Sequence, residues 1–317
     1  MPSSVVSVIN YKGGVGKTTL TANIGADLAA RGRRVLLVDL DPQASLTFSL
    51  YRPAEWEEQL AQSRTVLHWF ESYTATGVAD PLRKYVVSPP GVNAIVERYG
   101  GRLDLLASHL GLIEIDLDLA AGLGGARYQK SSPRYIPVHR LLADALRDEA
   151  FAAHDVVLID CAPNFNMVTR TAIVASDHVL VPARPDYLST LGIDYLRARL
   201  SRLVTEYNEA SATAEPAAGG GPATSGLINP EIVGVVYTMI QYTGTGILKA
   251  QRASMERMER IEIPVFRQTI RENKTAFTDA GDRGVPAVLA AERTSAVENL
   301  RYELQQLTSE LVARIRV

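Results

Sequence analysis

The 317-residue sequence contains one cysteine, Cys161, and few aromatic residues, which make up 7% of the chain. A single cysteine excludes an internal disulfide and favours a reducing compartment. It also cannot supply the ligands of a zinc site or an iron–sulfur cluster. No apolar run reaches membrane-spanning length, and the first residues lack the apolar core of a signal peptide. The sequence therefore predicts a cytoplasmic protein.

A strong charge of either sign is missing as well. The 33 lysines and arginines nearly balance the 35 aspartates and glutamates, which gives a formal net charge of −2. Any nucleic-acid binding must then come from a local basic patch. A hydrophobic content of 46% is typical of a globular chain with a sizeable core. The five histidines show no metal-ligand spacing, so we expect solvated or core roles for them.

Five apolar runs are too continuous for strands buried on one side only, and helical patterns separate most of them. Such runs are typical of parallel strands buried on both faces of a sheet. The runs are Val5–Ile9, Val35–Leu40, Val156–Ile159, Val179–Ala183 and Ile232–Tyr237. The sequence therefore predicts an α/β fold with a doubly wound, mainly parallel sheet and helices on both faces.

Two stretches interrupt this pattern. Tyr51–Gly101 mixes prolines with both tryptophans and has no clear assignment apart from a predicted helix at Val66–Tyr73. Ser211–Pro230, with its run A-A-G-G-G-P, is interpreted as a flexible loop, and a hinge between two domains is the alternative. Because the strands on both sides fit one sheet, we expect residues 1–317 to form a single domain.

The stretch Asn10–Thr19, N-Y-K-G-G-V-G-K-T-T, lies between the first predicted strand and a helical pattern at Leu20–Arg31. This order of strand, glycine loop and helix is the context of a phosphate-binding loop. Its backbone N–H groups would surround phosphate oxygens at the start of the helix. Lys17 is expected to reach the terminal phosphates and Thr18 to bind magnesium. The alternative is a glycine turn that binds nothing.

Acidic residues follow two of the predicted strands. The second strand ends in V-D-L-D-P-Q, which places Asp39 and Asp41 near the phosphate loop, at the carboxyl ends of the strands. The run V-V-L-I-D-C-A-P has the apolar-strand-then-aspartate form of a Walker B motif, so Asp160 is expected to hold magnesium through water or to orient the segment that follows. The alternative for Asp41 and Asp160 is a turn-capping role.

The phosphate loop departs from the ordinary pattern G-x-x-x-x-G-K-[ST], because Tyr11 stands at the first glycine and an additional lysine, Lys12, follows it. K-G-G-V-G-K-T-T resembles the deviant Walker A loop of the ParA/MinD ATPases, and D-L-D-P-Q resembles the ParA motif after the second strand. The resemblance covers most of the chain except Tyr51–Gly101 and the glycine-rich loop. Other matching segments are Arg102–Leu119, Ala175–Gly192, Gly234–Met239 and Pro264–Pro286.

This resemblance implies a ParA-type P-loop ATPase that uses ATP, ADP and Mg²⁺. It implies nucleotide contacts from Lys12, Gly13, Gly14, Val15, Gly16, Lys17, Thr18, Thr19, Thr238 and Met239, and places the segment near Ile270 beside the adenine. Magnesium would be held by Thr18, Asp41 and Asp160, and Asp41 would position the attacking water. Lys12 would reach the partner's phosphates in an ATP-bound homodimer; the alternative is a solvated loop lysine. Hydrolysis, slow alone and stimulated by a ParB-like partner, would release the dimer.

ParA relatives bind DNA nonspecifically as ATP-bound dimers, and the resemblance implies the same here, with nucleoid association. The candidate phosphate contacts are Lys249, Arg252, Arg257, Arg260, Arg267, Arg271 and Lys274. Glutamates are interleaved with them, which is also typical of a solvated helix face. Thr243 stands near the place where many ParA proteins have an arginine, so the DNA-binding surface is expected to be shifted or weakened.

Two other functions compete with this hypothesis. A membrane-cycling regulator of the MinD type needs a basic amphipathic tail, whereas Ser295–Val317 combines an apolar stripe with a face of mixed charge. Such a stripe more often packs on its own domain. A metabolic P-loop enzyme is the third hypothesis, and Lys12 and the D-L-D-P-Q motif argue against it.

Overall fold

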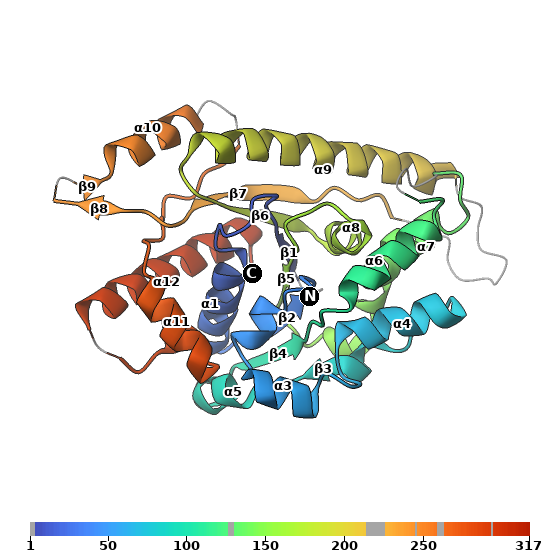
Figure 1. The fold of residues 1–317 in the computed structure, drawn as a ribbon, viewed down its shortest axis with the longest axis horizontal. Helices are drawn as coiled ribbons and strands as arrows, with labels where there is room; N and C mark the ends of the chain where they lie inside the picture. Colours follow the sequence, from blue (N-terminus) through green and yellow to red (C-terminus); the bar gives the residue numbers. More distant parts are fainter. Residues whose placement is uncertain (1–3, 126–129, 214–225, 245, 259–262, 293) are drawn as a thin grey trace.

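A computed structural model describes residues 4–125, 130–213, 226–244, 246–258, 263–292 and 294–317 (Figure 1). Its centre is a seven-stranded sheet with the order β3-β4-β2-β5-β1-β6-β7. Six strands are parallel, and only the short edge strand β3 pairs antiparallel with its neighbour. The strands are β1 Ser4–Val8, β2 Arg34–Asp39, β3 Val86–Val87, β4 Arg102–Leu106, β5 Val156–Asp160, β6 His178–Ala183 and β7 Glu231–Tyr237. The predicted doubly wound, mainly parallel sheet is confirmed.

Successive strand residues pack into two hydrophobic clusters, one on each face of the sheet. In β2, Leu36 and Val38 belong to one cluster, whereas Val35 and Leu37 belong to the other. Side chains alternate between the faces of a strand, so a strand covered on both sides needs apolar residues at every position. This is why the five predicted runs are continuous and why all five are strands.

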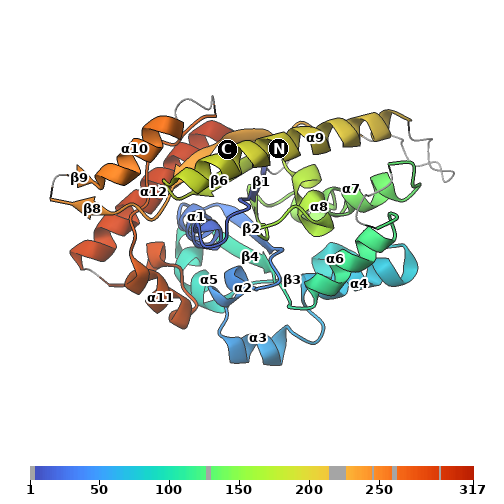
Figure 2. The same cartoon turned by 45° about the horizontal axis from the view of Figure 1, so that its top comes forward.

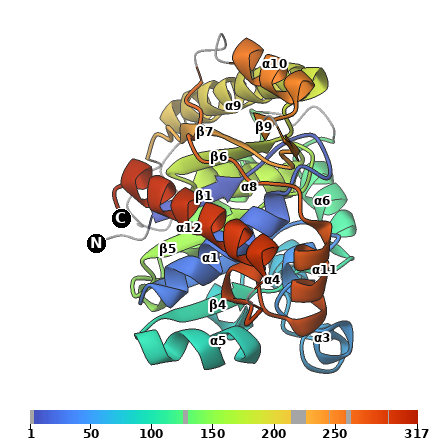
Figure 3. The same cartoon turned by 90° about the vertical axis from the view of Figure 1, so that its left-hand side faces the viewer.

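Helices cover both faces of the sheet (Figures 1 and 3). One face carries α4 Val66–Thr76, α6 Leu112–Ala121, α7 Tyr135–Ala145, α8 Met167–Ala175 and α9 Tyr187–Thr213. The other carries α1 Lys17–Ala30, α5 Pro90–Val96, α11 Lys274–Arg283 and α12 Ser295–Ile315. Because α1 follows β1 and α9 follows β6, both helices begin at the carboxyl ends of neighbouring strands.

Smaller elements lie around this framework. Figure 2 shows α3 Pro53–Gln59 at the periphery, and α10 Lys249–Met258 beside a hairpin of β8 Tyr242–Thr243 and β9 Gly246–Ile247. Within the described ranges, the other elements are α2 Ser45–Phe48 and four short 3₁₀ turns at Leu82–Tyr85, Glu97–Tyr99, Glu149–Phe151 and Ala287–Leu289.

The two stretches that interrupt the sequence pattern have different outcomes. Tyr51–Gly101 forms α3, α4, α5 and the edge strand β3, and the helix predicted at Val66–Tyr73 is confirmed as α4. Of the predicted loop Ser211–Pro230, the first three residues belong to the end of α9, residues 214–225 lie outside the described residues, and residues 226–230 form no helix or strand.

The C-terminal stripe is part of the core. On α12, Val297, Leu300, Leu304, Leu307, Leu311 and Ile315 are all buried, and the helix packs beside α1 (Figure 3). The expectation that this stripe packs on its own domain is confirmed. None of the helices in the described part of the chain combines the length and apolar character that crossing a bilayer requires.

Candidate nucleotide-binding site

The loop between β1 and α1 is shaped by glycines and fixed by side-chain hydrogen bonds. Gly14 and Gly16 have φ values of 67° and 84°, in the left-handed region that side chains with a Cβ rarely adopt. Asn10 Nδ2 donates to the carbonyl of Pro182 at 2.7 Å, which ties the start of the loop to β6. The loop therefore holds its shape, with the N-terminus of α1 directly behind it, in the arrangement that binds phosphate.

Lys17 and Thr18 form the first turn of α1. Burial lowers the pKa of Lys17, which is 6% exposed, while Asp160 and Asp41 act in the opposite direction. The Thr18 hydroxyl donates to Asp160 Oδ2 at 2.6 Å. The structure thus brings the predicted lysine, the predicted hydroxyl and the Walker B aspartate together at one point.

Two buried carboxylates lie side by side at the ends of neighbouring strands, because Asp39 of β2 is in register with Asp160 of β5. Burial raises the pKa of Asp39 to about 7 even though Thr47 donates to it from both its hydroxyl and its backbone N–H. Burial and the charge of Asp39 raise the pKa of Asp160 well above its usual range. A cation at this point would relieve both carboxylates.

The donor set fits a magnesium ion. Asp160 Oδ1 is buried and has no hydrogen-bond partner among the described residues, and the Thr18 hydroxyl lies beside the same carboxylate. No group of three or more His, Cys, Asp or Glu side chains with metal-binding spacing occurs in the described ranges. Magnesium commonly takes one or two protein ligands and completes its octahedron with phosphate oxygens and water.

Asp41 lies two residues beyond β2 and is partly exposed. Its Oδ1 accepts a hydrogen bond from the backbone N–H of Gln43 at 3.0 Å, which is the turn-capping contact. Its charge nevertheless acts on Lys17 and Asp160 and so lies near the phosphate loop. The role of Asp41 in positioning water stays a prediction.

A cavity of about 450 Å³ opens beside the phosphate loop. Gly14 and Gly16 form one side, and Thr238, Met239 and Ile270, all three predicted to flank the adenine, line it together. The Thr238 hydroxyl donates to the carbonyl of Val15 at 2.8 Å, which joins this wall to the loop. Glu272 and Asn273, in the predicted segment near Ile270, also line the cavity, whereas Arg184, Gln241 and Phe277 were not predicted.

Lys12 is held within its own chain. Its Nζ donates to Asp186 Oδ2 at 2.6 Å and to Ser189 Oγ at 3.4 Å, both near the start of α9. Burial alone would raise the pKa of Asp186, but hydrogen bonds from Lys12 and from the backbone N–H of Ser189 outweigh it and lower the pKa. The contact of Lys12 with a partner's phosphates stays a prediction.

The predicted DNA contacts are spread over several elements. Lys249, Arg252 and Arg257 are exposed on α10, which makes this helix the most basic of the candidate surfaces. Arg271 instead forms an ion pair with the buried Glu303 at 2.7 Å. Of the remaining candidates, Arg267 and Lys274 are exposed, and Arg260 lies outside the described residues.

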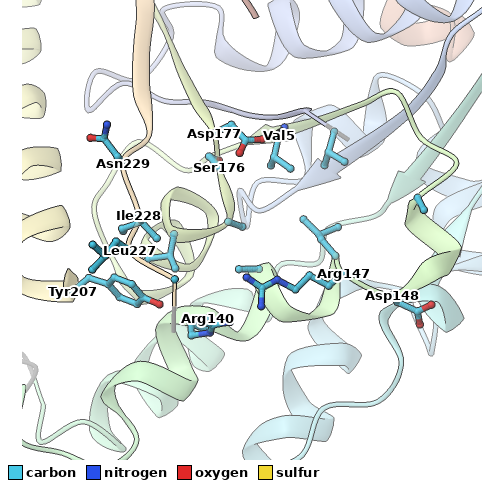
Figure 4. Close-up of a pocket in the computed structure, with 17 residues that line it drawn as sticks. Val5, Arg140, Arg147, Asp148, Ser176, Asp177, Tyr207, Leu227, Ile228 and Asn229 are labelled. Carbon is cyan, nitrogen blue, oxygen red and sulfur yellow. Dashed lines mark hydrogen bonds between the residues drawn. The ribbon is translucent and has the colours of Figure 1, made fainter. Parts of the chain in front are cut away.

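A second and larger cavity, of about 700 Å³, lies at the amino ends of β1 and β5 (Figure 4). Val5 lies in its wall, and Figure 4 shows Arg140 of α7 and Arg147, which follows that helix, across from Asp177. The Asp177 carboxylate accepts a hydrogen bond from the backbone N–H of Val5 at 2.9 Å. No sequence motif pointed to this cavity.

A family model described as an AAA domain matches residues 3–212. A chromosome partitioning protein ParA of Caulobacter vibrioides is 31% identical over 241 residues, which cover 75% of this chain and 70% of that protein. The chain belongs to the ParA family of P-loop ATPases. The resemblance found in its sequence motifs is confirmed.

Solved structures share the ParA-family fold. The apo structure of McdA from Cyanothece matches with a TM-score of 0.69 at 18% identity, covering 98% of this chain and 99% of that one. Cobyrinic acid a,c-diamide synthase from Mycobacterium smegmatis, with bound ADP and magnesium, matches with a TM-score of 0.58 at 26% identity, covering 88% of this chain and 91% of that one. The chain spans only 46% and 55% of the length of other curated relatives that it matches.

Proposed function

We propose that this ParA-family chain is an ATP-dependent, dimerising ATPase. In its ATP form it binds DNA nonspecifically and drives the partitioning or positioning of DNA or another cargo, in the cytoplasm and on the nucleoid. The proposal rests mainly on one observation: Lys17, Thr18 and Asp160 meet at a glycine loop that borders a cavity. One oxygen of the buried Asp160 carboxylate has no hydrogen-bond partner among the described residues. That arrangement suits a nucleoside triphosphate with its magnesium ion.

In this proposal the chain itself supplies binding and orientation. The loop amides and Lys17 would hold the phosphates, and Thr18, Asp41 and Asp160 would hold a magnesium ion that neutralises the charge developing on the phosphate. Asp41 orients the attacking water. Turnover is slow in the isolated protein, because a ParB-like partner is needed to stimulate it.

Dimerisation depends on the third phosphate. The Lys12 side chain is 31% exposed, and its ion pair with Asp186 is exposed enough to be exchanged for a partner's phosphates. Tyr187, Leu188 and Leu191, beside it on α9, expose half or more of their surface, and such apolar surface suits a subunit contact. ADP lacks the γ-phosphate, so hydrolysis releases the pair.

DNA binding by α10 rests on Lys249, Arg252 and Arg257. Exposed side chains of this kind contact phosphates without reading bases, so the affinity should fall steeply with salt. The chain is nearly neutral overall, so a single α10 is expected to bind DNA weakly. A dimer would present two copies of this basic helix to the same DNA and so raise the affinity.

The decisive experiment is sedimentation of the purified protein with ADP or a non-hydrolysable ATP analogue, each with and without nonspecific DNA. We expect dimers only with the ATP analogue, and DNA co-sedimentation only for those dimers. A variant with Lys249, Arg252 and Arg257 changed to alanine should dimerise without binding DNA, whereas changing Arg197 and Arg202, which are exposed on α9, should preserve both properties. A protein that is monomeric with either nucleotide would contradict the proposal.

The likeness to the Mycobacterium smegmatis synthase favours one other candidate, a metabolic P-loop synthetase. That function predicts nucleotide binding without nucleotide-dependent dimers or DNA binding, so the same sedimentation experiment separates the two. A MinD-like membrane role would need the apolar stripe of α12 to face the membrane, whereas this stripe is buried in the core.

A further inference from the structure

We infer that Tyr11 is a positioning residue: its ring, packed against Phe165 and Tyr195, fixes the entry of the phosphate loop and thereby the place of the Lys12 ammonium. The catalytic meaning of this placement rests on the proposed function. The placement itself concerns the chain without nucleotide and can be tested separately.

The ring of Tyr11 joins the connections that follow three neighbouring strands. It stacks on Phe165, which follows β5, with ring centres 6.1 Å apart and planes inclined by 20°. It also meets Tyr195 of α9, which follows β6, with centres 5.0 Å apart. Since β1 lies between β5 and β6 in the sheet, Tyr11 holds the loop after the central strand to the segments on both sides.

Arginines complete the cluster. The guanidinium of Arg199, one turn beyond Tyr195, lies 5.4 Å from the Phe165 ring centre and 6.0 Å from that of Tyr195. The buried Arg170 of α8 lies 5.7 Å from the Phe165 ring centre. A cation placed over the face of an aromatic ring is attracted to that ring. The two guanidinium groups therefore stabilise the ring positions, Arg170 from α8 and Arg199 from α9.

Three consecutive loop residues are thus held by different contacts. Asn10 bonds to Pro182, the Tyr11 ring packs on Tyr195, and Lys12 pairs with Asp186. Tyr11 lies between the other two, at the position where an ordinary phosphate loop has a glycine. A ring at that position removes backbone freedom that glycine would have kept, so it restricts where the next side chain can lie.

The competing interpretation is that Tyr11 only adds to the hydrophobic core, since it packs against the cluster on that face of the sheet. Such a role would affect stability and leave the environment of Lys12 unchanged. The two interpretations therefore make different predictions for the chemical reactivity of the Lys12 amine when Tyr11 is changed.

The test compares Tyr11→Ala, Tyr11→Phe and Tyr195→Ala, with Tyr302→Ala, an exposed tyrosine of α12, as the matched control. Reductive methylation of the nucleotide-free protein is followed by mass spectrometry, and Lys12 is scored against the exposed Lys249. We expect Tyr11→Ala and Tyr195→Ala to raise the relative modification of Lys12 about fivefold, because the bonds that hold its ammonium loosen. Tyr11→Phe should restore the wild-type ratio, and Tyr302→Ala should keep it.

ATP turnover supplies the second measurement. Tyr11→Ala should lower kcat about tenfold while KM stays within about threefold, since misplacing a reacting group costs rate more than binding. If the wild type has no ATPase activity, the proposed function fails while the methylation ratio still decides the inference. If Tyr11→Ala does not fold, Tyr195→Ala carries the test. A lowered Tm with an unchanged Lys12 ratio in the folded variants would overturn the positioning role.

Discussion

The two ends of the sheet each hold a cavity, of about 450 Å³ beside the phosphate loop at the carboxyl ends of the strands and about 700 Å³ at the amino ends. At the amino ends, charged side chains are paired within the fold: Arg140 with Asp144 at 2.6 Å, and Asp148 with Arg83. At the carboxyl ends, by contrast, Asp160 Oδ1 is buried with no hydrogen-bond partner among the described residues.

Buried atoms without a partner in the described part of the chain also occur at the amino ends, such as Ser4 Oγ and His178 Nδ1, but Asp160 Oδ1 belongs to a carboxylate, so the difference indicates where a cation would be needed. Buried polar atoms in native proteins are nearly always satisfied, so an exception marks either strain or a missing partner. Burial removes both groups from water, which lowers the pKa of Lys17 and raises the pKa of Asp160. We therefore expect the chemistry to take place at Lys17 and Asp160, on the phosphate loop that borders the smaller cavity, and four variants test this expectation.

Lys17→Ala should have the largest effect. Removing the ammonium that reaches the phosphates should weaken ATP binding at least about 1,000-fold, measured by calorimetry or a fluorescent nucleotide. Arg147→Ala, at the amino-end cavity, is the matched control and should keep wild-type affinity. If Arg147→Ala were the damaging change, the functions of the two cavities would be reversed.

Lys12→Ala should separate binding from turnover. We expect ATP affinity to stay within about threefold, while ATP-dependent dimerisation disappears and turnover falls at least about 1,000-fold, as on removing a charge supplied in trans. Light scattering and steady-state ATPase assays report the two losses. Normal dimers and turnover in this variant would show that Lys12 is only a partner of Asp186.

Asp41→Ala should leave binding intact and slow hydrolysis about 100-fold, because the attacking water loses its orienting carboxylate. The expected product is an ATP-bound dimer that persists on size-exclusion chromatography. Gln43→Ala is a suitable control, since the hydrogen bond to Asp41 comes from the backbone N–H of residue 43. Rapid turnover by Asp41→Ala would leave the aspartate with its turn-capping role alone.

Asp39→Asn should have the smallest effect, a change in pH dependence. Burial raises the pKa of Asp39 to about 7, so the folded chain binds this proton more tightly than the unfolded chain. The resulting stabilisation is present below about pH 4 and lost as the pH rises to about 7. Urea unfolding across this range should show a flatter curve for Asp39→Asn than for the wild type, and parallel curves would contradict the pKa shift.

Sequence reasoning identified the features that short segments encode. The sheet followed from runs of apolar residues, and the phosphate loop from glycines and Lys17 within ten residues. The partners of Lys12 were missed, because Asp186 lies 174 positions away and looks like an ordinary turn residue. Phe277 was missed for the same reason, since only the folded chain brings it to the cavity that Gly16 also lines.

The segment Tyr51–Gly101 was missed for a different reason. Its helices are short and the edge strand β3 has only two residues, so no hydrophobic period is long enough to recognise. Trp69 is nevertheless fully buried, and Trp56 donates to the carbonyl of Ser108 at 3.2 Å. Tertiary packing rather than local pattern determines this part of the fold.

Cys161 follows the Walker B aspartate directly and is completely buried. Burial raises the pKa of its thiol to about 12, so an alkylating reagent should not react with it in the folded chain. It is the sole sulfhydryl of the sequence, so a thiol reagent would label this position alone. The rate of labelling would report how often the strand end beside Asp160 opens to solvent. Comparing the labelling rate with and without nucleotide would then show whether the nucleotide protects this strand end, and no reporter group would have to be added.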